Sequence, residues 1–551
     1  MNTTYELCGK RIRSRIGLPS GVSATTPPRI ELLAKLLPIG FIIGKTTTYL
    51  PKDGHQPPVY VQFKPNPFSA MNAIGLKNIG SPVTAEQLAQ IKIPRDFALI
   101  YSVAGVTPED FVAAAKPLLP YVHGVEPNIS CSHDKKLGYV IGQDIDLVLQ
   151  IIEALLEQAK PLFLKLSPRM DIKEIVRATR YTGIAGYSLI NTLGPKPFLI
   201  DGEPVLTNGE GSISGAEITE LALDCILEAR RNTELPIIGG GGFSTGEHAL
   251  RALDNGANLV AIGTANTGMS TITMARYYPA LLGDVENGTD EAGKILREVA
   301  KTLGPSMEYR KIQVAEKRML AEDLFILRFT RRFDARPWQF VFIRIPRLGE
   351  RPFSILDNSP FSLLIKIRGG CTKFLSEMNA GDTVWVRGPY GNDPHIEGKV
   401  LLVGGGTGGA SLAMFAKEHT TRTVAVLGAK DRAHLYDEPF KPHCDSVYSF
   451  VENDGIENYG YHGYGYHGKV TDYLSNIIRT EQPDFCLNCG PMEMVRRAIE
   501  IEERFLPEKQ VLSAVEFHTA CGVGICGQDS TPSGWSSCVD GPFLTKSQLG
   551  L

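Results

Sequence analysis

The sequence has no marked excess of charge of either sign. Its 57 lysines and arginines nearly balance 60 aspartates and glutamates, which leaves a formal net charge of −3 over 551 residues. A protein that binds nucleic acid or an acidic membrane surface usually carries a basic face. We therefore expect neither nucleic acid nor membrane among the partners of this chain.

The sequence also lacks a long apolar run. Its most apolar stretches, such as VLLVGGG and LVAIG, are far shorter than the ~20 residues of a membrane-spanning helix. The first residues, MNTTYELCGKRIRSRIGL, show no basic segment followed by an apolar run and a cleavage site. These patterns predict a soluble, cytoplasmic protein.

Cysteine is scarce, with ten residues in the whole chain. That number is too small for the disulfide framework of a secreted scaffold. The cysteines are unevenly spaced, however, because Cys521, Cys526 and Cys538 lie close together near the C-terminal end. This clustering is a first indication of a metal site.

The composition supports packed cores. Hydrophobic residues make up 43% and charged residues 21% of the chain, which excludes a disordered or fibrous protein. The 56 glycines and 36 prolines follow no repeat period. They indicate many tight turns and close approaches of the backbone to ligands.

The first 300 or so residues alternate short apolar strands with stretches that have helical spacing, such as DLVLQIIEALLEQ. Eight strands, each followed by room for a helix, favour a closed (β/α)8 barrel over an open doubly wound sheet. Functional residues of such a barrel lie at the carboxyl ends of the strands. The expected strands are 15–19, 40–46, 96–103, 124–130, 161–167, 186–192, 235–241 and 259–265.

The pattern changes after about residue 305, and we expect the boundary within GPSMEY, residues 304–309. Strands then follow at short spacing, as in an antiparallel barrel or sandwich. From about residue 398 strands and helices alternate again, which indicates a small parallel α/β unit. The stretch NYGYHGYGYHG, residues 458–468, predicts a solvated hairpin or loop without chemistry. The expected antiparallel strands are 309–318, 323–330, 340–346, 361–369 and 382–389.

Several expected barrel strands end in polar residues that a purely structural barrel would not need. The loops after the seventh and eighth strands, IIGGGG (237–242) and AIGTA (261–265), can expose backbone N–H groups to a phosphate. A phosphate site with lysines near a ring suggests FMN. The polar residues are Lys45, Asn78, Asn128, Ser130, Cys131, Lys165, Asn191 and Thr192.

Taken in order, the strings GKTTT, NAIGLKN, PNISC, FLKLS and SLINT resemble the class 1 dihydroorotate dehydrogenases over about residues 10–300. The resemblance implies an FMN that takes a hydride from dihydroorotate while a base, here Cys131, removes a proton. A free thiol titrates near pH ~8.5 and can act as a base when its surroundings tune it. The alternative is that Cys131 is a small buried hydrophobic residue.

The same resemblance assigns the other barrel residues. Lys165, as a second catalytic residue, and Lys45 would face the flavin, where a cation stabilises the anionic reduced ring; the alternative for both is a solvated surface lysine. The implied substrate contacts are Asn78, Asn128, His133, Asn191 and Thr192. The implied FMN contacts are Ser20, Gly21, Lys45, Asn128, Lys165, Gly215, Gly240, Gly241, Gly242, Gly263 and Thr264.

The loop after Cys131 departs from the family pattern. The family continues with Pro-Asn-Val, whereas this chain reads Ser132-His133-Asp134, so that His133 stands where an asparagine normally contacts the ring. His133 is an altered substrate contact, a tolerated loop residue or a second acid or base. The departure concerns the identity of the substrate more than the redox chemistry.

Residues 306–551 resemble the electron-transfer subunit of the NAD-dependent dihydroorotate dehydrogenases, which binds FAD, a [2Fe–2S] cluster and NAD. RPFSI and GGCTKFL carry the FAD part of the resemblance, VGGGTGG and CGPMEM carry the NAD part, and GPYG (388–391) accompanies them. Taken alone, RPFS could equally be an ordinary strand. The implied FAD contacts are Arg351, Pro352, Phe353, Ser354, Gly370 and Thr372, and the implied NAD contacts are Gly404, Gly405, Gly406, Thr407, Gly408, Cys489, Gly490 and Pro491.

The cluster motif departs from the family as well. The family has four cysteines, whereas this chain has Asp529 at the third position and Cys538 only nine residues later. Three thiolates and one carboxylate can still bind two irons, so the predicted ligands are Cys521, Cys526, Asp529 and Cys538. The alternatives are a degenerate site without a cluster and His518 as a substitute ligand. Gly522 and Gly524 favour a loop that wraps a cluster.

These motifs predict an α/β and β protein with four parts. They are an FMN-binding (β/α)8 barrel (1–305), a FAD-binding antiparallel β-barrel (306–397), an NAD-binding parallel α/β domain (398–510) and a [2Fe–2S] module (511–551). The first interpretation is an NAD-linked enzyme that interconverts dihydroorotate and orotate, as a homodimer through the barrel. The alternatives are an enzyme for another small, carboxylated substrate and a non-catalytic electron-transfer protein.

Overall fold

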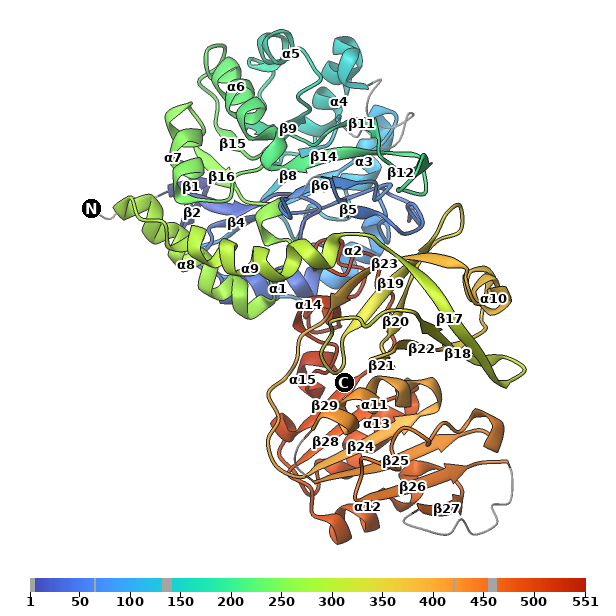
Figure 1. Ribbon diagram of the computed structural model, residues 1–551. Coiled ribbons are helices and arrows are strands. Elements are labelled where there is room, and N and C mark those ends of the chain that lie inside the picture. Colours follow the sequence, from blue (N-terminus) through green and yellow to red (C-terminus); the bar gives the residue numbers. More distant parts are fainter. Residues whose placement is uncertain (1–4, 64–65, 131–140, 420–421, 454–462) are drawn as a thin grey trace. The chain divides into compact units, whose positions relative to one another are not determined.

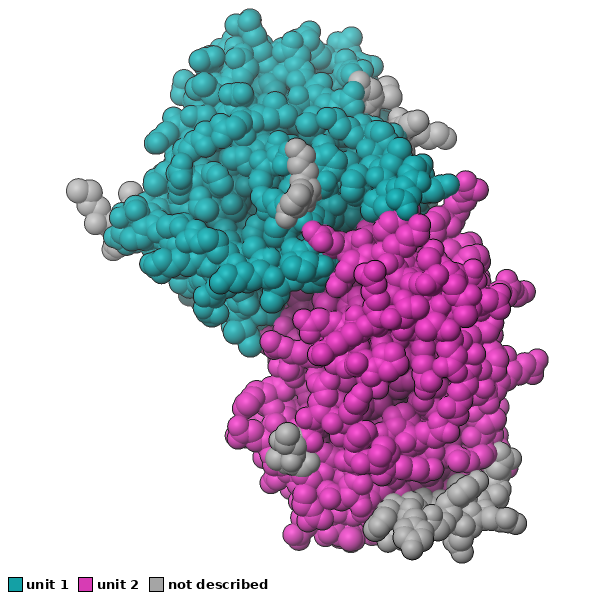
Figure 2. Space-filling model, in the orientation of Figure 1, with its two compact units in different colours: residues 1–307, 523–530 teal, residues 308–522, 531–551 magenta. Residues whose placement is uncertain are grey.

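The computed structural model describes residues 5–63, 66–130, 141–419, 422–453 and 463–551. The chain divides into two units, which Figures 1 and 2 show. The first unit consists of Met1–Met307 and Val523–Ser530, and the second of Glu308–Gly522 and Thr531–Leu551. The division into four domains stays a prediction.

An eight-stranded parallel sheet forms the centre of the first unit, and it contains the eight strands expected from the sequence. Their hydrogen-bonded order is β8-β7-β4-β3-β16-β15-β10-β9. Single bridges from Val125 to Leu162 and from Asn128 to Lys165 connect the two ends of this order. The sheet is thus nearly closed, which confirms the predicted barrel. The strands are β3 (Ile16–Leu18), β4 (Phe41–Thr47), β7 (Ala98–Val103), β8 (Gly124–Pro127), β9 (Phe163–Leu166), β10 (Gly186–Leu189), β15 (Ile237–Gly239) and β16 (Leu259–Ala261).

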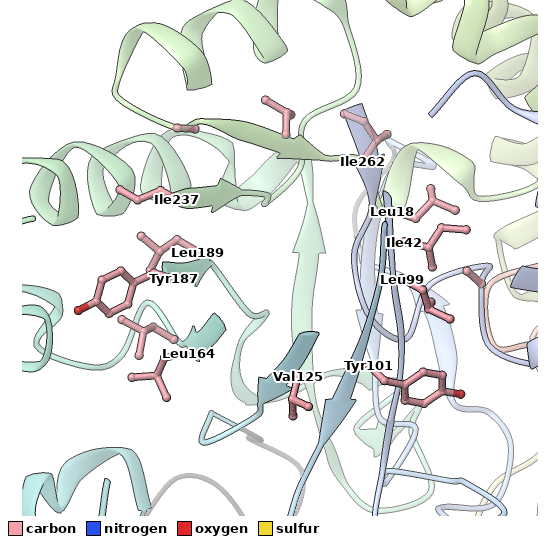
Figure 3. Packing of buried hydrophobic residues seen from close by; sticks show 14 of the residues in the cluster. Leu18, Ile42, Leu99, Tyr101, Val125, Leu164, Tyr187, Leu189, Ile237 and Ile262 are labelled. Atoms are coloured by element: carbon pink, nitrogen blue, oxygen red, sulfur yellow. The ribbon is translucent and has the colours of Figure 1, made fainter. Parts of the chain in front are cut away.

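The barrel strands are buried along almost their whole length because both of their faces are covered. Strand β7 reads ALIYSV, and all six of its residues are buried. Leu18, Ile42 and Leu99 come from three neighbouring strands and lie on the same side of the sheet (Figure 3). They share a core with Leu33 of helix α1 (Pro27–Leu36).

Helices follow the strands and cover the barrel (Figure 1). Helix α5 (Ile172–Thr179) shows why they form, since its buried residues recur at helical spacing and Asp171 Oδ1 accepts a hydrogen bond of 2.9 Å from Glu174 N. The other helices are α2 (Ser81–Leu88), α3 (Pro108–Ala115), α4 (Ile145–Leu156), α6 (Thr219–Arg230), α7 (Gly246–Asp254), α8 (Thr271–Asn287) and α9 (Glu291–Met307), with short η1 (Ile141–Gln143), η2 (Ala216–Ile218) and η3 (Thr264–Asn266).

Three small antiparallel sheets of the first unit were not expected from the sequence. A four-stranded sheet has the order β11-β14-β6-β5, and it pairs Asn72 with Ser212. It ends at Gly215, one of the predicted FMN residues. Its strands are β5 (Tyr60–Gln62), β6 (Ser69–Asn72), β11 (Leu193–Pro197) and β14 (Glu210–Gly215); the two hairpins are β1 (Tyr5–Leu7) with β2 (Lys10–Ile12) and β12 (Leu199–Ile200) with β13 (Glu203–Pro204).

A seven-stranded antiparallel sheet opens the second unit, as predicted. Arg351 and Ser354 lie on β20, paired with Ile343 and Phe340 of β19. The order β20-β19-β23-β17-β18-β22-β21 joins β17 (Arg310–Ala321), β18 (Leu324–Phe329), β19 (Phe340–Ile345), β20 (Gly349–Ser354), β21 (Asp357–Asn358), β22 (Phe361–Lys366) and β23 (Thr383–Tyr390), and helix α10 spans Gly370–Glu377.

A six-stranded parallel sheet with the order β27-β26-β25-β24-β28-β29 completes the second unit. The expectation of a solvated hairpin or loop at 458–468 was wrong for residues 463–467, which form the edge strand β27 and pair in parallel with β26. Tyr466 of this strand stacks on Phe450 with ring centroids 5.1 Å apart, and this packing favours the strand. Residues 458–462 lie outside the described residues.

The strands of this sheet are β24 (Val400–Gly405), β25 (Thr423–Ala429), β26 (Ser446–Val451), β27 (Gly463–His467), β28 (Phe485–Cys489) and β29 (Val511–Ala514). The helices are α11 (Ala410–Glu418), α12 (Val470–Glu481), α13 (Met492–Glu502), α14 (Ser537–Asp540) and α15 (Lys546–Leu549), with short η4 (Gly406–Gly409), η5 (Arg432–His434) and η6 (Glu508–Gln510). Among the described residues, no helix is both long and apolar enough to cross a membrane.

Candidate active site

The predicted barrel residues lie at the carboxyl ends of the parallel strands, which meet on one rim of the barrel. Strand β3 is followed by Ser20 and Gly21, β4 carries Lys45, β8 is followed by Asn128, β9 carries Lys165, and β10 is followed by Asn191 and Thr192. Gly240, Gly241 and Gly242 follow β15, and Gly263 and Thr264 follow β16.

Amide and hydroxyl side chains of this rim form one chain of hydrogen bonds. Asn191 Nδ2 donates to Ser130 Oγ at 2.9 Å, and Ser130 Oγ donates to Asn128 Oδ1 at 3.0 Å. Asn128 Nδ2 donates to Thr46 Oγ1 at 3.1 Å, and Thr46 Oγ1 lies 2.9 Å from Ser102 Oγ. The chain holds two predicted substrate residues, Asn128 and Asn191, in fixed orientations.

Lys165 of β9 is connected to this chain through Ser20, whose Oγ lies 3.5 Å from Thr46 Oγ1. Its Nζ donates to Ser20 Oγ at 2.8 Å and lies 3.5 Å from Glu126 Oε1. The side chains of Lys165 and Glu126 are 10% and 1% exposed. The site therefore contains a lysine and a carboxylate that are both withdrawn from water.

Asn78 is the predicted substrate residue whose amide is most engaged by its own surroundings. Its Oδ1 accepts hydrogen bonds from Thr47 Oγ1 and Gly80 N, each at 2.9 Å. Its Nδ2 donates to Leu76 O at 2.7 Å and to Thr48 Oγ1 at 3.1 Å. Direct contact with a substrate would require Asn78 to exchange some of these partners.

Glycines near the ends of β14 and β15 leave room for a group that binds through backbone N–H donors. A Cβ on Gly242 would lie 2.2 Å from Gly215 O and 2.5 Å from Thr219 Oγ1, and Gly242 and Gly215 have φ of +78° and +92°. Thr219 Oγ1, at the start of α6, is buried without a hydrogen-bond partner among the described residues. This lining fits the phosphate end of FMN.

The predicted base Cys131 and the predicted substrate contact His133 lie outside the described residues. Ser132 and Asp134, which define the departure from the family pattern, lie there as well. The three alternatives for His133 therefore stay open.

Three residues of the rim were not identified from the sequence: Thr46 and Ser102 of the hydrogen-bonded chain, and Glu126 beside Lys165. Each lies on a barrel strand, within GKTTT, IYSV and VEPN, where the polar residue looked like part of an ordinary strand. A signal was present, because a buried parallel strand rarely contains a polar residue without a partner.

In the second unit, the predicted FAD residues lie on β20 and at the start of α10. Arg351 Nη1 donates to Glu350 O at 2.7 Å. Thr372 Oγ1 accepts from Gly369 N at 3.1 Å, and a Cβ on Gly370 would meet no atom within 4 Å. The flanking Pro352, Phe353 and Ser354 are part of β20, and only Ser354 is fully exposed.

The structure brings the two predicted NAD loops together at the carboxyl ends of β24 and β28, where Gly404 pairs with Cys489. A Cβ on Gly408 would lie 2.5 Å from Cys489 O, and one on Gly405 would lie 3.0 Å from Pro491 Cδ. The glycines are thus needed for the close approach of the two loops. Between them lie Gly406 and Thr407, and Gly490 faces Gly405.

A buried polar cluster lies on β28 and α13. Asn488 Nδ2 donates to Glu502 Oε2 at 2.7 Å and to Ser513 Oγ at 3.1 Å. Asn488 Oδ1 and Glu502 Oε1 have no hydrogen-bond partner among the described residues. Burial raises the pKa of Glu502 to about 7.

The predicted cluster ligands are buried, with Cys521, Cys526, Asp529 and Cys538 between 0% and 5% exposed. Cys521 and Cys538 belong to the second unit, and Cys526 and Asp529 to the first. No three His, Cys, Asp or Glu side chains of the described residues form a site for one metal ion. Each iron of a [2Fe–2S] cluster needs only two protein ligands, so the four-ligand assignment and His518 stay predictions.

A fully buried ion pair lies beside Cys521 in the second unit. Arg387 Nε and Nη2 donate to Glu350 at 3.0 and 2.5 Å, and Arg387 Nη1 donates to Tyr390 Oη at 2.7 Å and to Cys521 O at 2.9 Å. Tyr309 Oη donates to Glu350 Oε2 at 2.6 Å. The pair thus fixes the backbone at Cys521.

Comparisons with known proteins identify relatives of the first unit. The family model described as dihydroorotate dehydrogenase matches residues 3–276. The chain is 32% identical over 265 residues to the dihydroorotate dehydrogenase B (NAD(+)) catalytic subunit of Archaeoglobus fulgidus, a match that covers 47% of this chain and 86% of the relative.

Two further relatives are similar to the same extent. The corresponding catalytic subunit of Geobacillus kaustophilus is 35% identical over 261 residues, covering 45% of this chain and 81% of that protein. The dihydroorotate dehydrogenase A (fumarate) of Lacticaseibacillus paracasei is 35% identical over 239 residues, covering 41% of this chain and 80% of that protein. The residues that the family model matches all belong to the first unit.

Proposed function

This chain belongs to the dihydroorotate dehydrogenase family, and on that premise we propose that it interconverts dihydroorotate and orotate and exchanges the electrons with NAD. FMN in the barrel would accept the hydride from the substrate. FAD and a [2Fe–2S] cluster in the rest of the chain would connect it to NAD, at Arg351 and Thr372, at Cys521, Cys526, Asp529 and Cys538, and at the loops of Gly404–Gly408 and Cys489–Pro491.

The observation that carries the proposal is the hydrogen-bonded rim of the barrel. Asn128 and Asn191 are joined through Ser130, so their amides are held in place before a substrate binds. Amide groups suit a ring with alternating donors and acceptors, because each amide offers both. Fixed partners lower the entropy cost of orienting a substrate against a cofactor.

The chain supplies its own groups for proton transfer and charge. Cys131 is proposed as the base that removes the substrate proton. Lys165, held by Ser20 Oγ at 2.8 Å, would face the ring that receives the hydride. An ammonium group at this position stabilises negative charge that develops in the transition state.

The test is an anaerobic titration of the full chain with dihydroorotate, followed by flavin bleaching; NAD is then added and NADH formation is recorded. We expect both signals, and flavin that stays oxidised would contradict the proposed substrate. Asn191→Ala should lower kcat/KM by about 10²-fold, as for a lost positioning contact. The matched control is Asn255→Ala, whose Nδ2 donates to Leu223 O at 3.1 Å away from the rim and which should keep kcat/KM.

A second candidate is another small carboxylated substrate with a CH–CH bond, oxidised on the same scaffold. Asn78 favours it, because its amide is already engaged by Thr47, Gly80 and Leu76. His133 in place of the family asparagine points the same way. Flavin bleaching by succinate but not by dihydroorotate, or the reverse, would separate the two candidates.

A further inference from the structure

Glu126 is a buried carboxylate that the proposed reaction does not use. It lies on β8 between Val125 and Pro127, and only 1% of its side chain is exposed. A carboxylate withdrawn from water requires hydrogen bonds or a close cation. Its Oε1 has no hydrogen-bond partner among the described residues, so its compensation is incomplete.

The cation nearest to Glu126 Oε1 in the described ion pairs is Lys165, at 3.5 Å. This distance allows attraction between the charges but exceeds that of a strong charge-assisted hydrogen bond. The Lys165 ammonium donates its shorter bond, 2.8 Å, to the neutral Ser20 Oγ. Lys165 is thus held between a hydroxyl and a carboxylate, and its charge is only partly offset.

The strand pairing fixes both residues. Lys165 pairs with Ser188 of β10 and forms a bridge with Asn128, and Glu126 pairs with Ser102 of β7. Because both side chains project from strands of a nearly closed barrel, the barrel keeps the two charged groups close together. A group bound at the rim beside Lys165 is therefore exposed to both charges.

We infer that Glu126 is a positioning residue that holds the Lys165 ammonium on the barrel wall and offsets part of its positive charge toward a flavin at the rim. The inference rests on the proposed binding of FMN in the barrel. It assigns Glu126 a role through Lys165 and not through contact with the substrate. A purely structural carboxylate would support packing but would leave the charge at the flavin unchanged.

The inference predicts the direction in which the sulfite affinity of the flavin changes. Removal of the carboxylate charge makes the surroundings of Lys165 more positive, and a more positive site favours an anionic flavin. Sulfite adds to oxidised flavin and leaves a negative charge on the ring, so its affinity measures this effect without substrate. Glu126→Gln should tighten sulfite binding by about tenfold, as expected for one charge in partly screened surroundings.

The experiment is a sulfite titration of the full chain with bound flavin, followed by the loss of flavin absorbance. Glu126→Gln is compared with the wild type, with Thr179→Val as a control that removes a buried neutral hydroxyl of helix α5, outside the rim. The midpoint potential of the same flavin should rise in Glu126→Gln and stay unchanged in Thr179→Val. Unchanged sulfite affinity and unchanged potential in Glu126→Gln would overturn the inference.

A second pair of variants shows that Glu126 acts through Lys165. In a Lys165→Met background, Glu126→Gln should change sulfite affinity by less than about twofold, because the ammonium that it modulates is gone. A full tenfold effect in that background would contradict the inference. Glu126→Asp keeps the charge, so it should bind sulfite less tightly than Glu126→Gln. Equal affinities of the two variants would contradict the charge argument.

The titration is separate from the proposed reaction. Sulfite needs no dihydroorotate, so a chain that binds FMN but does not oxidise dihydroorotate would refute the proposed substrate only. The role of Glu126 would still be decided by the sulfite affinity. The flavin of the second unit serves as an internal reference, since substitutions on β8 and β9 should leave its signal unchanged.

Discussion

Glu126 in the first unit and Glu350 in the second are both buried against a basic side chain, but their surroundings differ. Glu350 accepts two hydrogen bonds from Arg387 and one from Tyr309. Glu126 lies 3.5 Å from Lys165, and one of its oxygens has no hydrogen-bond partner among the described residues. The Arg387–Glu350 pair is fully hydrogen-bonded and holds the backbone at Cys521 in place. The Lys165–Glu126 pair is only partly hydrogen-bonded, so its charges can still act on a bound ligand.

The difference follows from the two side chains as well as from their positions. Arg387 has a planar fork of donors and can bind Glu350, Tyr390 and a backbone carbonyl at once. Lys165 has a single ammonium group that is shared between Ser20 and Glu126. Buried charges with incomplete hydrogen bonding are tolerated where function requires them. The following predictions test the difference between the two pairs.

The largest expected effect is the loss of the Arg387 pair. Arg387→Met should lower the free energy of unfolding of the second unit by about 3–5 kcal/mol, because Glu350 is left buried and unpaired. Urea unfolding, monitored for the second unit, measures the change. The double variant Arg387→Met with Glu350→Leu is the control and should recover most of the loss; a single variant that loses under about 1 kcal/mol would contradict the comparison.

Glu502 offers an intermediate case, because its buried carboxylate accepts a hydrogen bond from the neutral amide of Asn488 and not from a cation. Its pKa is raised by burial from 4.5 to about 7. The folded state therefore holds the proton more tightly, so the contribution of Glu502 to stability is greatest at low pH and falls as the pH rises from about 4.5 to above 7.

Glu502→Gln should remove this pH dependence and stabilise the protein at pH ~8 by at most about 3 kcal/mol. The measurement is the free energy of unfolding at pH ~5.5 and ~8 for both proteins. Glu500→Gln, on the exposed side of the same helix and paired with Arg497, is the matched control and should change little. Equal pH dependence in the wild type and Glu502→Gln would show that Glu502 does not titrate in this range.

A smaller effect tests the hydrogen bond that completes the Glu350 site. Tyr309→Phe removes the 2.6 Å bond to Glu350 Oε2 and should cost about 2 kcal/mol, the range for a bond to a charged group. Tyr277→Phe in the first unit removes a 2.7 Å bond to the neutral Ser244 O and should cost about 1 kcal/mol. If both changes cost the same in urea unfolding, the charge of Glu350 adds nothing to its bond with Tyr309.

Much of the fold could be predicted from the sequence because buried parallel strands carry apolar runs, as ALIYSV of β7 does. The four-stranded sheet β11-β14-β6-β5 could not. Its pairing of Asn72 with Ser212 joins short segments about 140 positions apart, and no local pattern records such a contact. The strand β27 was missed for a related reason, since its support comes from Phe450 on another strand.

The candidate site was predictable where a polar residue ends an apolar strand, as at Lys165 and Asn128. It was not predictable where the role of a side chain depends on its hydrogen-bond or ion-pair partner in the folded structure. Asn78 is present as expected, yet its amide is engaged by Thr47 and Gly80. Glu126 was read as part of a strand, although the barrel brings it within 3.5 Å of Lys165.

The smallest expected effect concerns a charge cluster that is partly exposed, since the side chains of His434, Asp323 and Asp431 are 25%, 41% and 30% exposed. His434 Nδ1 lies 2.6 Å from Asp431 and its Nε2 lies 2.7 Å from Asp323, which is itself 3.3 Å from Lys366. These carboxylates, Asp431 before Asp323, raise the pKa of His434 above its usual 6.5. The stabilising contribution is therefore full below pH ~6.5 and is lost as the pH rises through the raised pKa.

His434→Gln should remove a stability difference of less than about 1 kcal/mol between pH ~6 and ~8.5, because the site is open to solvent and screened. Both proteins are compared in the Glu502→Gln background, so that the larger titration of Glu502 does not mask the smaller one. His395→Gln is the matched control, since His395 is 88% exposed beside a single carboxylate, Glu397. A difference well above 1 kcal/mol at His434 would mean that partly exposed charge pairs contribute as much to the free energy of unfolding as the buried ones. That result would contradict the comparison between them.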